Sequence, residues 1–198
     1  MKKKVIAVDL DNVLAKFGEH LCETISECEG ENISSSDVKC WDIHKYFKCG
    51  TKVYEYMTED LFRNLPVIEN SQESIKKLME DFEVVIVTSA TNNKNSLKAK
   101  MEWLEEHFPF ISHENIILCG NKRYILCDYM IDDYYKNLDG TMGYGILFDS
   151  HHNKDVETYP RANNWQEVLD VIYKREESLK ESKELLLNME LERYFNKI

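Results

Sequence analysis

The sequence has no apolar segment long enough to cross a membrane. A transmembrane helix needs about 18 consecutive apolar residues, and no run in these 198 residues approaches that length. The apolar run at residues 5–8 is too short for the hydrophobic part of a signal peptide and leads directly into two aspartates. We therefore expect a cytoplasmic protein that does not bind membranes.

The sequence also lacks an excess of basic residues and closely paired cysteines. Lysine and arginine number 25 against 36 aspartates and glutamates, which gives a formal net charge of −11. Binding a nucleic-acid polymer needs clustered cations, so we expect no such partner, although a few local cations can still bind a small anion. None of the six cysteines lies in a Cys-x-x-Cys pair, so we interpret them as free thiols in a reducing compartment.

Short apolar runs alternate with amphipathic segments along the chain. Runs at residues 5–8, 84–87, 116–118, 129–131 and 145–148 predict five strands. Helical patterns lie between several of them, for example the stripe of Leu97, Met101, Leu104 and Phe108, which Pro109 ends. Strands that alternate with helices indicate a parallel sheet with right-handed crossovers. The expected fold class is α/β, a Rossmann-like parallel sheet of about five strands flanked by helices.

Residues 17–70 differ in composition from the rest of the chain. They are rich in Glu, Cys, Ser, Lys and aromatic residues and contain no clear apolar strand. Helical patches are expected at residues 20–28, 35–43 and 53–63. We interpret this segment as a small helical cap inserted after the first strand, so that residues 1–16 and 71–175 form the catalytic core. Asn70 and Glu73 resemble a capping box where the chain re-enters the core.

Residues 176–198 form a charged C-terminal helical tail with a cluster of apolar residues at 185–187. The amphipathic stripe that begins at Trp165 should pack on the sheet. The tail exceeds what the core needs, so it could extend this helix, pack on a partner subunit or fray. Packing within its own chain is our expectation, and a homodimer is an open alternative.

Polar side chains follow four of the predicted strands. In chain order they are Asp9 with Asp11, Thr88 with Ser89, Lys122, and Asp132 with Asp133. The carboxyl ends of parallel strands meet at one rim of the sheet, where ligands of open α/β sheets bind. Asp9 and Asp11 are two residues apart, so their side chains point to the same spot and repel each other unless a cation lies there. Oxygen ligands of this kind suit Mg²⁺.

The motif Asp9-Leu10-Asp11-Asn12-Val13-Leu14-Ala15 resembles the first motif of the haloacid dehalogenase superfamily of phosphohydrolases. Within it, the chain is most similar to the cytosolic type C 5′(3′)-deoxyribonucleotidases. Further similarity lies at residues 62–67, 87–90, 131–133 and 159–165, and the resemblance covers roughly residues 4–175. It implies a Mg²⁺-dependent enzyme that hydrolyses (deoxy)nucleoside monophosphates to nucleoside and phosphate through an aspartyl-phosphate intermediate.

The resemblance also implies a role for each rim residue. Asp9 would be the nucleophile and a metal ligand, and Asp11 the general acid and base, with its backbone carbonyl on the metal. Thr88, Ser89 and Lys122 would bind the phosphate. Asp132 and Asp133 would complete the metal site, but the sequence leaves open which of them touches the ion. Asp128 could be a further helper, although a loop carboxylate without a catalytic role is the simpler interpretation.

The cap is the part of the chain that matches the family least well. Phe17 falls where the family stacks an aromatic ring near the base, and Trp41 is a second candidate for the substrate base. Other aromatic candidates are Tyr46, Phe47, Tyr54 and Tyr56, each of which could instead belong to the core of the cap. Asn12 stands where many relatives have glycine. The alternative functions are a sugar-phosphate or general small-metabolite phosphatase or phosphotransferase, and a non-catalytic nucleotide-binding module.

Overall fold

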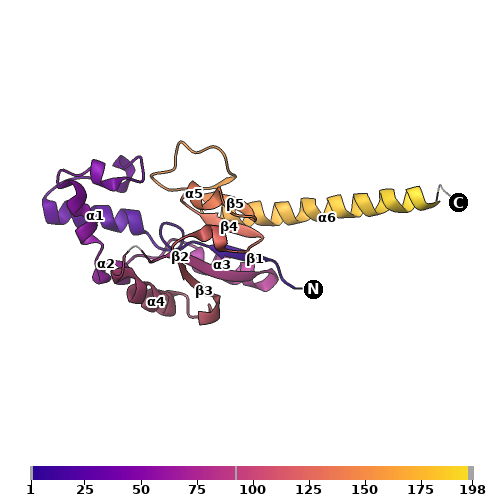
Figure 1. Ribbon diagram of the computed structural model, residues 1–198, viewed down its shortest axis with the longest axis horizontal. Coiled ribbons are helices and arrows are strands. Elements are labelled where there is room, and N and C mark those ends of the chain that lie inside the picture. The colour runs from indigo at the N-terminus through magenta and orange to yellow at the C-terminus, as the bar shows by residue number, and fades with distance from the viewer. Residues whose placement is uncertain (1, 92, 196–198) are drawn as a thin grey trace.

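The protein is built around a parallel sheet of six strands, seen in a computed structural model that describes residues 2–91 and 93–195 (Figure 1). The strands lie in the order β3-β2-β1-β4-β5-β6, and every neighbouring pair is parallel. Their bounds are β1 Val5–Val8, β2 Glu83–Ser89, β3 Ile116–Cys119, β4 Tyr129–Asp132, β5 Tyr144–Phe148 and β6 Arg161–Ala162. The α/β class is confirmed. The sixth strand, β6, was missed because two residues are too short to show a period.

The central strands are apolar on both faces because the sheet is covered on both sides. Ile6 and Val8 on one face join the larger core cluster, which also includes residues of α3 (Ser71–Asp81), α4 (Asn95–His107) and α6 (Trp165–Phe195) and extends into the helices of the insert. Ala7 and Met130 on the other face join a smaller cluster under α5 (Tyr135–Leu138).

The insert between β1 and α3 is helical, but its middle was predicted wrongly. It contains α1 (Phe17–Glu29), the 3₁₀ helices Ser35–Asp37, Ile43–Lys45 and Gly50–Tyr56, and α2 (Glu59–Arg63). The expected helix at 35–43 does not form: its two buried apolar residues, Val38 and Ile43, are five apart, which does not fit one helical face. The expected helix at 53–63 is divided at Met57–Thr58, where the Thr58 hydroxyl caps α2 by accepting from Leu61 N.

The predicted capping box at the start of α3 is also wrong. Asn70 has a left-handed backbone (φ 62°), and its side chain makes no capping hydrogen bond. A capping-box residue needs an extended backbone instead. Asparagine tolerates the left-handed region, so Asn70 serves as the turn into α3.

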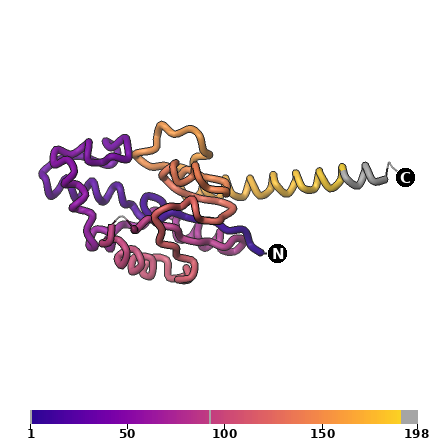
Figure 2. The backbone as a smooth tube through the Cα atoms, in the orientation of Figure 1, coloured from indigo at the N-terminus to yellow at the C-terminus, as the bar shows by residue number. Residues whose placement is uncertain are grey.

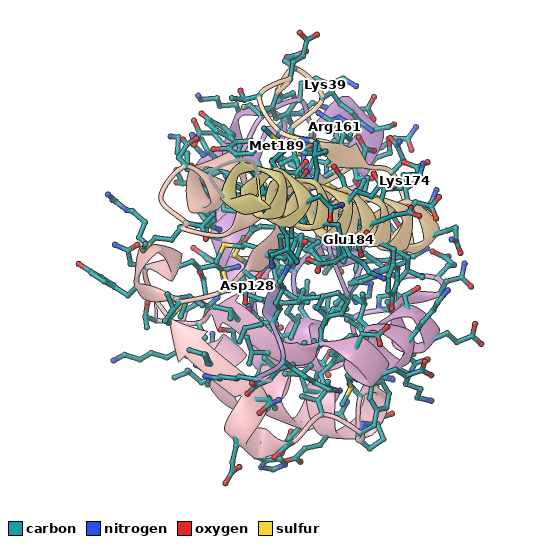
Figure 3. The ribbon with its side chains drawn as sticks, turned by 90° about the vertical axis from the view of Figure 1, so that its right-hand side faces the viewer. Lys39, Asp128, Arg161, Lys174, Glu184 and Met189 are labelled. Atoms are coloured by element: carbon teal, nitrogen blue, oxygen red, sulfur yellow. The ribbon has the colours of Figure 1, made fainter. Side chains whose placement is uncertain are left out.

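Helix α6 continues far beyond the sheet (Figures 1 and 2). Its first turns are buried, and Glu176 is held to the body by Lys4 at 2.6 Å. Beyond this point the helix projects outward, and Figure 3 views it nearly end-on with Glu184 and Met189 labelled. Leu185, Leu186 and Leu187 are 57–62% exposed, so the expectation that the tail packs within its own chain is wrong. Among the described residues, no helix is long and apolar enough to span a membrane.

Candidate active site

The sheet order brings the predicted rim residues together. β1 lies between β2 and β4, so Asp9 after β1 is next to the ends of both neighbouring strands. Thr88 and Ser89 end β2, and Asp132 ends β4. Lys122 comes from the 3₁₀ helix Lys122–Tyr124, which follows β3. Residues far apart in the sequence therefore share one edge of the sheet.

Lys122 joins two of the carboxylates. Its ammonium lies 2.5 Å from Asp9 Oδ1 and 2.6 Å from Asp132 Oδ2, and its side chain is 2% exposed. Burial alone lowers the pKa of Lys122, but the carboxylates of Asp132 and Asp9 outweigh burial and raise the pKa above its ordinary value. Lys122 therefore stays charged beside Asp9 and Asp132.

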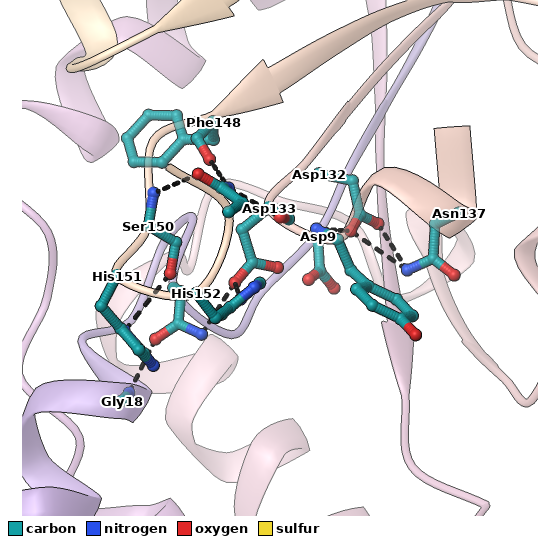
Figure 4. Close-up of polar contacts among 12 residues, drawn as sticks. Asp9, Gly18, Asp132, Asp133, Asn137, Phe148, Ser150, His151 and His152 are labelled. Atoms are coloured by element: carbon teal, nitrogen blue, oxygen red, sulfur yellow. Dashed lines mark hydrogen bonds and ion pairs between the residues drawn. The ribbon is translucent and has the colours of Figure 1, made fainter. Parts of the chain in front are cut away.

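Asp132 and Asp133 have different surroundings (Figure 4). Both oxygens of Asp132 are engaged: Oδ2 accepts from Lys122, Oδ1 accepts from Tyr134 N at 2.8 Å, and the Asn137 amide donates to both. Asp133 uses one oxygen, Oδ2, which accepts from the Asn12 amide and lies 2.8 Å from His152 Nε2. Its Oδ1 accepts from no residue that the structure describes, which leaves that oxygen available to a cation.

Asn12 connects the rim at Asp133 to the start of α1. Its backbone is left-handed (φ 58°), a conformation that glycine and asparagine tolerate best. Its amide donates to Asp133, and its Oδ1 accepts from Gly18 N at 2.7 Å. Asparagine at this position therefore adds a link between α1 and the rim that glycine could not make.

The charges at the rim fit a divalent cation. The rim holds four carboxylates and two ammonium groups: Asp9, Asp11, Asp132, Asp133, Lys100 and Lys122. This is a formal excess of two negative charges.

Burial raises the pKa of Asp9 well above its ordinary value, against the lowering effect of Lys122, and the neighbouring carboxylates raise it further. Ligand oxygens of Asp9, Asp132 and Asp133 lie within 4.8 Å of one another, and an all-oxygen set suits Mg²⁺.

Lys100 is a rim residue that the sequence analysis missed. It lies on α4, is 1% exposed, and places its ammonium 2.6 Å from Asp11 Oδ2. The expected apolar stripe of α4 was wrong in part: Leu97 is 38% exposed, whereas Ser96, Ala99, Lys100, Trp103 and Leu104 are buried. Lys100 shares one face of the helix with Ala99 and Trp103, and this spacing in the sequence was the signal for a buried charge. The contacts of His152 had no comparable signal, because they depend on how a long loop folds back.

A cleft of about 400 Å³ opens beside the rim. The residues that line it include Asp9, Asp11 and Lys122, and also Phe17, Trp41 and other aromatic residues. Phe17 stacks on Phe62 with 5.5 Å between ring centroids, and Trp41 stacks on Tyr134 at 4.2 Å. Of the other aromatic candidates, Tyr54 also lines the cleft, whereas Phe47 is buried in the insert. Tyr46 and Tyr56 pack against the same core as Phe47.

Asp128 lies away from the rim. Its Oδ2 accepts from the backbone N–H of Val5, at the beginning of β1 rather than at its end. Asp128 therefore lies at the end of the sheet where β1 begins, opposite to the rim. Its hydrogen bond to Val5 links the first strand to the residues just before β4. The simpler interpretation, a loop carboxylate, agrees with this position, and the alternative of a catalytic helper does not, because a strand's length separates Asp128 from Asp9.

Comparison with known proteins gives a consistent result. The family model described as 5′ nucleotidase, deoxy (pyrimidine), cytosolic type C matches residues 3–178. A 5′(3′)-deoxyribonucleotidase of Bacillus subtilis is 48% identical over 166 residues, which are 84% of this chain and 96% of that protein. A 5′(3′)-deoxyribonucleotidase of Clostridium acetobutylicum is 39% identical over 171 residues, covering 85% and 94% of the two chains.

Solved structures show the same fold at low sequence identity. A haloacid dehalogenase-like hydrolase of Bacillus subtilis, crystallised with magnesium, has a TM-score of 0.57 at 13% identity, over 87% of this chain and all of that one. A hydrolase of the same superfamily from Deinococcus radiodurans, with bound phosphate and sodium, gives the same TM-score and identity over 87% and 96%. The chain therefore belongs to the cytosolic type C 5′(3′)-deoxyribonucleotidase family, phosphoric monoester hydrolases with the haloacid dehalogenase-like fold.

Proposed function

We propose that the protein hydrolyses deoxyribonucleoside monophosphates to nucleoside and phosphate with Mg²⁺ as its cofactor. The observation that carries the proposal is the convergence of Asp9, Lys122 and the Asp132–Asp133 pair at one rim, beside a cleft that aromatic residues help to line. The relatives named 5′(3′)-deoxyribonucleotidases support the substrate class.

In this proposal Asp9 is the nucleophile. One of its oxygens attacks phosphorus, the bond to the nucleoside oxygen breaks, and an aspartyl phosphate forms. Asp11 gives the leaving oxygen a proton and later takes one from the water that hydrolyses the intermediate. Thr88, Ser89 and Lys122 bind the phosphate oxygens, because charge on the transferred group must be neutralised by fixed donors and cations.

Asp9, the backbone carbonyl of Asp11 and Asp133 would hold the Mg²⁺ ion. When bound, the ion supplies positive charge to the transferred phosphoryl group. The free Oδ1 of Asp133 favours this residue as the direct ligand. Asp132 fixes Lys122 instead, since its oxygens are already engaged by Lys122, Tyr134 and Asn137.

Phe17 and Trp41 are proposed to contact the base. Both line the cleft, and aromatic rings offer stacking surface to any base. Trp41 is 55% exposed although it stacks on Tyr134. A large aromatic side chain that stays exposed at the wall of a cleft suits ligand contact better than a role in the core.

The test is a phosphate-release panel in Mg²⁺ with dUMP, dTMP, ribonucleotides, 3′-monophosphates and sugar phosphates. We expect the highest kcat/KM with deoxyribonucleotides, and loss of activity when the metal is chelated. Equal rates on sugar phosphates and nucleotides would overturn the substrate class.

The nucleophile is tested by trapping the intermediate. Acid-quenched enzyme should contain a phosphorylated peptide at Asp9, and Asp9→Asn should lower turnover by several orders of magnitude. Asp42→Asn is the matched control, because Asp42 is an exposed carboxylate of the insert. Normal turnover in Asp9→Asn would overturn the assignment.

A further inference from the structure

We propose that Lys100 is a positioning residue that orients the carboxyl group of Asp11 for proton transfer to the leaving oxygen. This inference rests on the proposed function. Lys100 is a buried lysine on helix α4, whereas the predicted rim residues follow strands. Such a charge is costly to bury unless it is paired, and the contacts of Lys100 show what it is paired with.

The ammonium of Lys100 has three N–H donors, and three oxygens accept them. Asp11 Oδ2 lies at 2.6 Å, the Ser89 carbonyl at 2.9 Å and Thr88 Oγ1 at 3.1 Å. An ammonium has no further donor. Lys100 therefore has no proton left for a phosphate oxygen, and this separates it from Lys122. Its effect on the reaction must pass through Asp11 and Thr88.

Lys100 also makes the two oxygens of Asp11 different. Oδ2 accepts a hydrogen bond from the ammonium of Lys100. An ammonium has no lone pair, so it could not accept a hydrogen bond from Oδ2. Oδ1 is therefore the oxygen of Asp11 that is left to exchange a proton with a substrate oxygen. This atom is buried and has no hydrogen-bond partner among the described residues. A buried polar atom without a partner is costly, and a substrate oxygen that accepts its proton would remove that cost.

The proton transfer balances with these groups alone. As the bond from phosphorus to the leaving oxygen breaks, its electron pair stays on that oxygen, which takes the proton from Oδ1. Phosphorus forms its new bond to Asp9. Asp11 becomes a carboxylate, and its new negative charge lies beside the Lys100 ammonium. The ring of Phe62, 5.3 Å from that ammonium, covers the pair from the side of α2.

The leaving group provides the test, because a nucleoside oxygen needs a proton to depart and nitrophenolate does not. First-turnover release of nucleoside from dUMP and of nitrophenol from p-nitrophenyl phosphate would be measured for wild type and Lys100→Met. General acid catalysis contributes about 10²–10⁴-fold. We expect Lys100→Met to lose about 100-fold with dUMP and far less with the aryl ester. Lys98→Met, on an exposed turn of the same helix, should match wild type with both.

A double-mutant comparison tests whether Lys100 acts through Asp11. Asp11→Asn should show the same selective loss, and Lys100→Met should add little to it. Equal losses of Lys100→Met with both esters would overturn the proposal, and so would no loss with either. Lys100→Gln, which keeps two N–H donors, repeats the test if the methionine variant does not fold.

An alkyl ester without a base, ribose 5-phosphate, separates this inference from the proposed function. If wild type is inactive on nucleotides but cleaves ribose 5-phosphate, the substrate assignment fails. The Lys100 inference is then tested by the same ratio of alkyl to aryl rates.

Discussion

At the scale of single residues, the adjacent Asp132 and Asp133 are predicted to respond differently to the same substitution. Asp133→Asn removes a proposed metal ligand, so the Mg²⁺ concentration for half-maximal activity should rise at least about 10-fold. Asp132→Asn should leave that concentration nearer to wild type and lower stability instead, because Lys122 loses a buried partner. Magnesium titration and thermal unfolding measure the two effects. A larger rise in Asp132→Asn would contradict the assignment.

His151 predicts a loss of stability in mild acid. Burial, together with the nearby His152, lowers the pKa of His151 to about 4 from 6.5. Below pH 6.5 the unfolded chain therefore binds a proton that the folded protein does not. The stability that this neutral ring contributes is complete above pH 6.5 and is lost as the pH falls towards 4. Urea unfolding across this range measures it, and His151→Gln should flatten the slope. An unchanged slope would exclude His151 as the cause.

The rim residues could be predicted from sequence because each follows an apolar run. Asp9, Thr88 and Asp132 needed only strand periodicity and the rule that parallel strands end at one edge. Lys100 and His152 could not be found in the same way, because their roles depend on contacts across 89 and 19 residues of chain. The choice between Asp132 and Asp133 as the proposed metal ligand was also beyond the sequence, since both aspartates have the same chemistry and only their partners distinguish them.

At the scale of elements, α4 links the insert to the rim. One of its faces carries Lys100, and Trp103 on the same face donates from Nε1 to the carbonyl of Leu65 at 2.7 Å, where the chain returns from the insert. Arg63 at the end of α2 pairs with Glu106 of α4. One helix therefore contacts both the insert and Asp11.

The hydrogen bond of Trp103 should contribute measurably to stability. Trp103→Phe keeps most of the ring but leaves the buried Leu65 carbonyl without its donor, which should cost about 1–3 kcal/mol. The free energy of urea unfolding measures this cost. Trp41→Phe is the control, because Trp41 is largely exposed and its loss should change stability by less than about 0.5 kcal/mol. Equal effects of the two substitutions would contradict the anchoring role.

The elements of the insert were harder to predict than those of the sheet. Buried strands such as β1 and β2 are continuous apolar runs, which have few alternative interpretations. The insert instead uses short 3₁₀ turns with isolated apolar contacts such as Val38 and Ile43. Such turns have no repeating pattern, because each buries one side chain rather than a face.

At the scale of the whole molecule, the projecting part of α6 should be dispensable for folding and turnover. Residues 181–189 are all exposed, and the family model ends at residue 178. A chain ending at Lys180 keeps Glu176 and its contact with Lys4. Its free energy of unfolding should stay within about 0.5 kcal/mol of the full chain, and its kcat/KM should be unchanged. Thermal unfolding and the phosphate-release assay check both, and a large loss in either would show that the tail has a structural role.

The exposed leucines of the tail allow a second measurement. Apolar side chains that gather on an exposed helix favour association, so the full chain should show more self-association than the shortened one in sedimentation velocity experiments. Identical sedimentation behaviour of the two chains would show that the tail does not contribute to the formation of a homodimer.

The long terminal helix leaves the body at the end opposite the insert, and the amino terminus lies on that same side (Figure 1). The cleft, by contrast, is lined in part by insert residues such as Trp41 and Tyr54. A chain tethered to a solid support through its carboxyl end would thus hold the insert and its side of the cleft away from the support. The helix would act as a built-in spacer of about 1.5 Å per residue between the support and the catalyst.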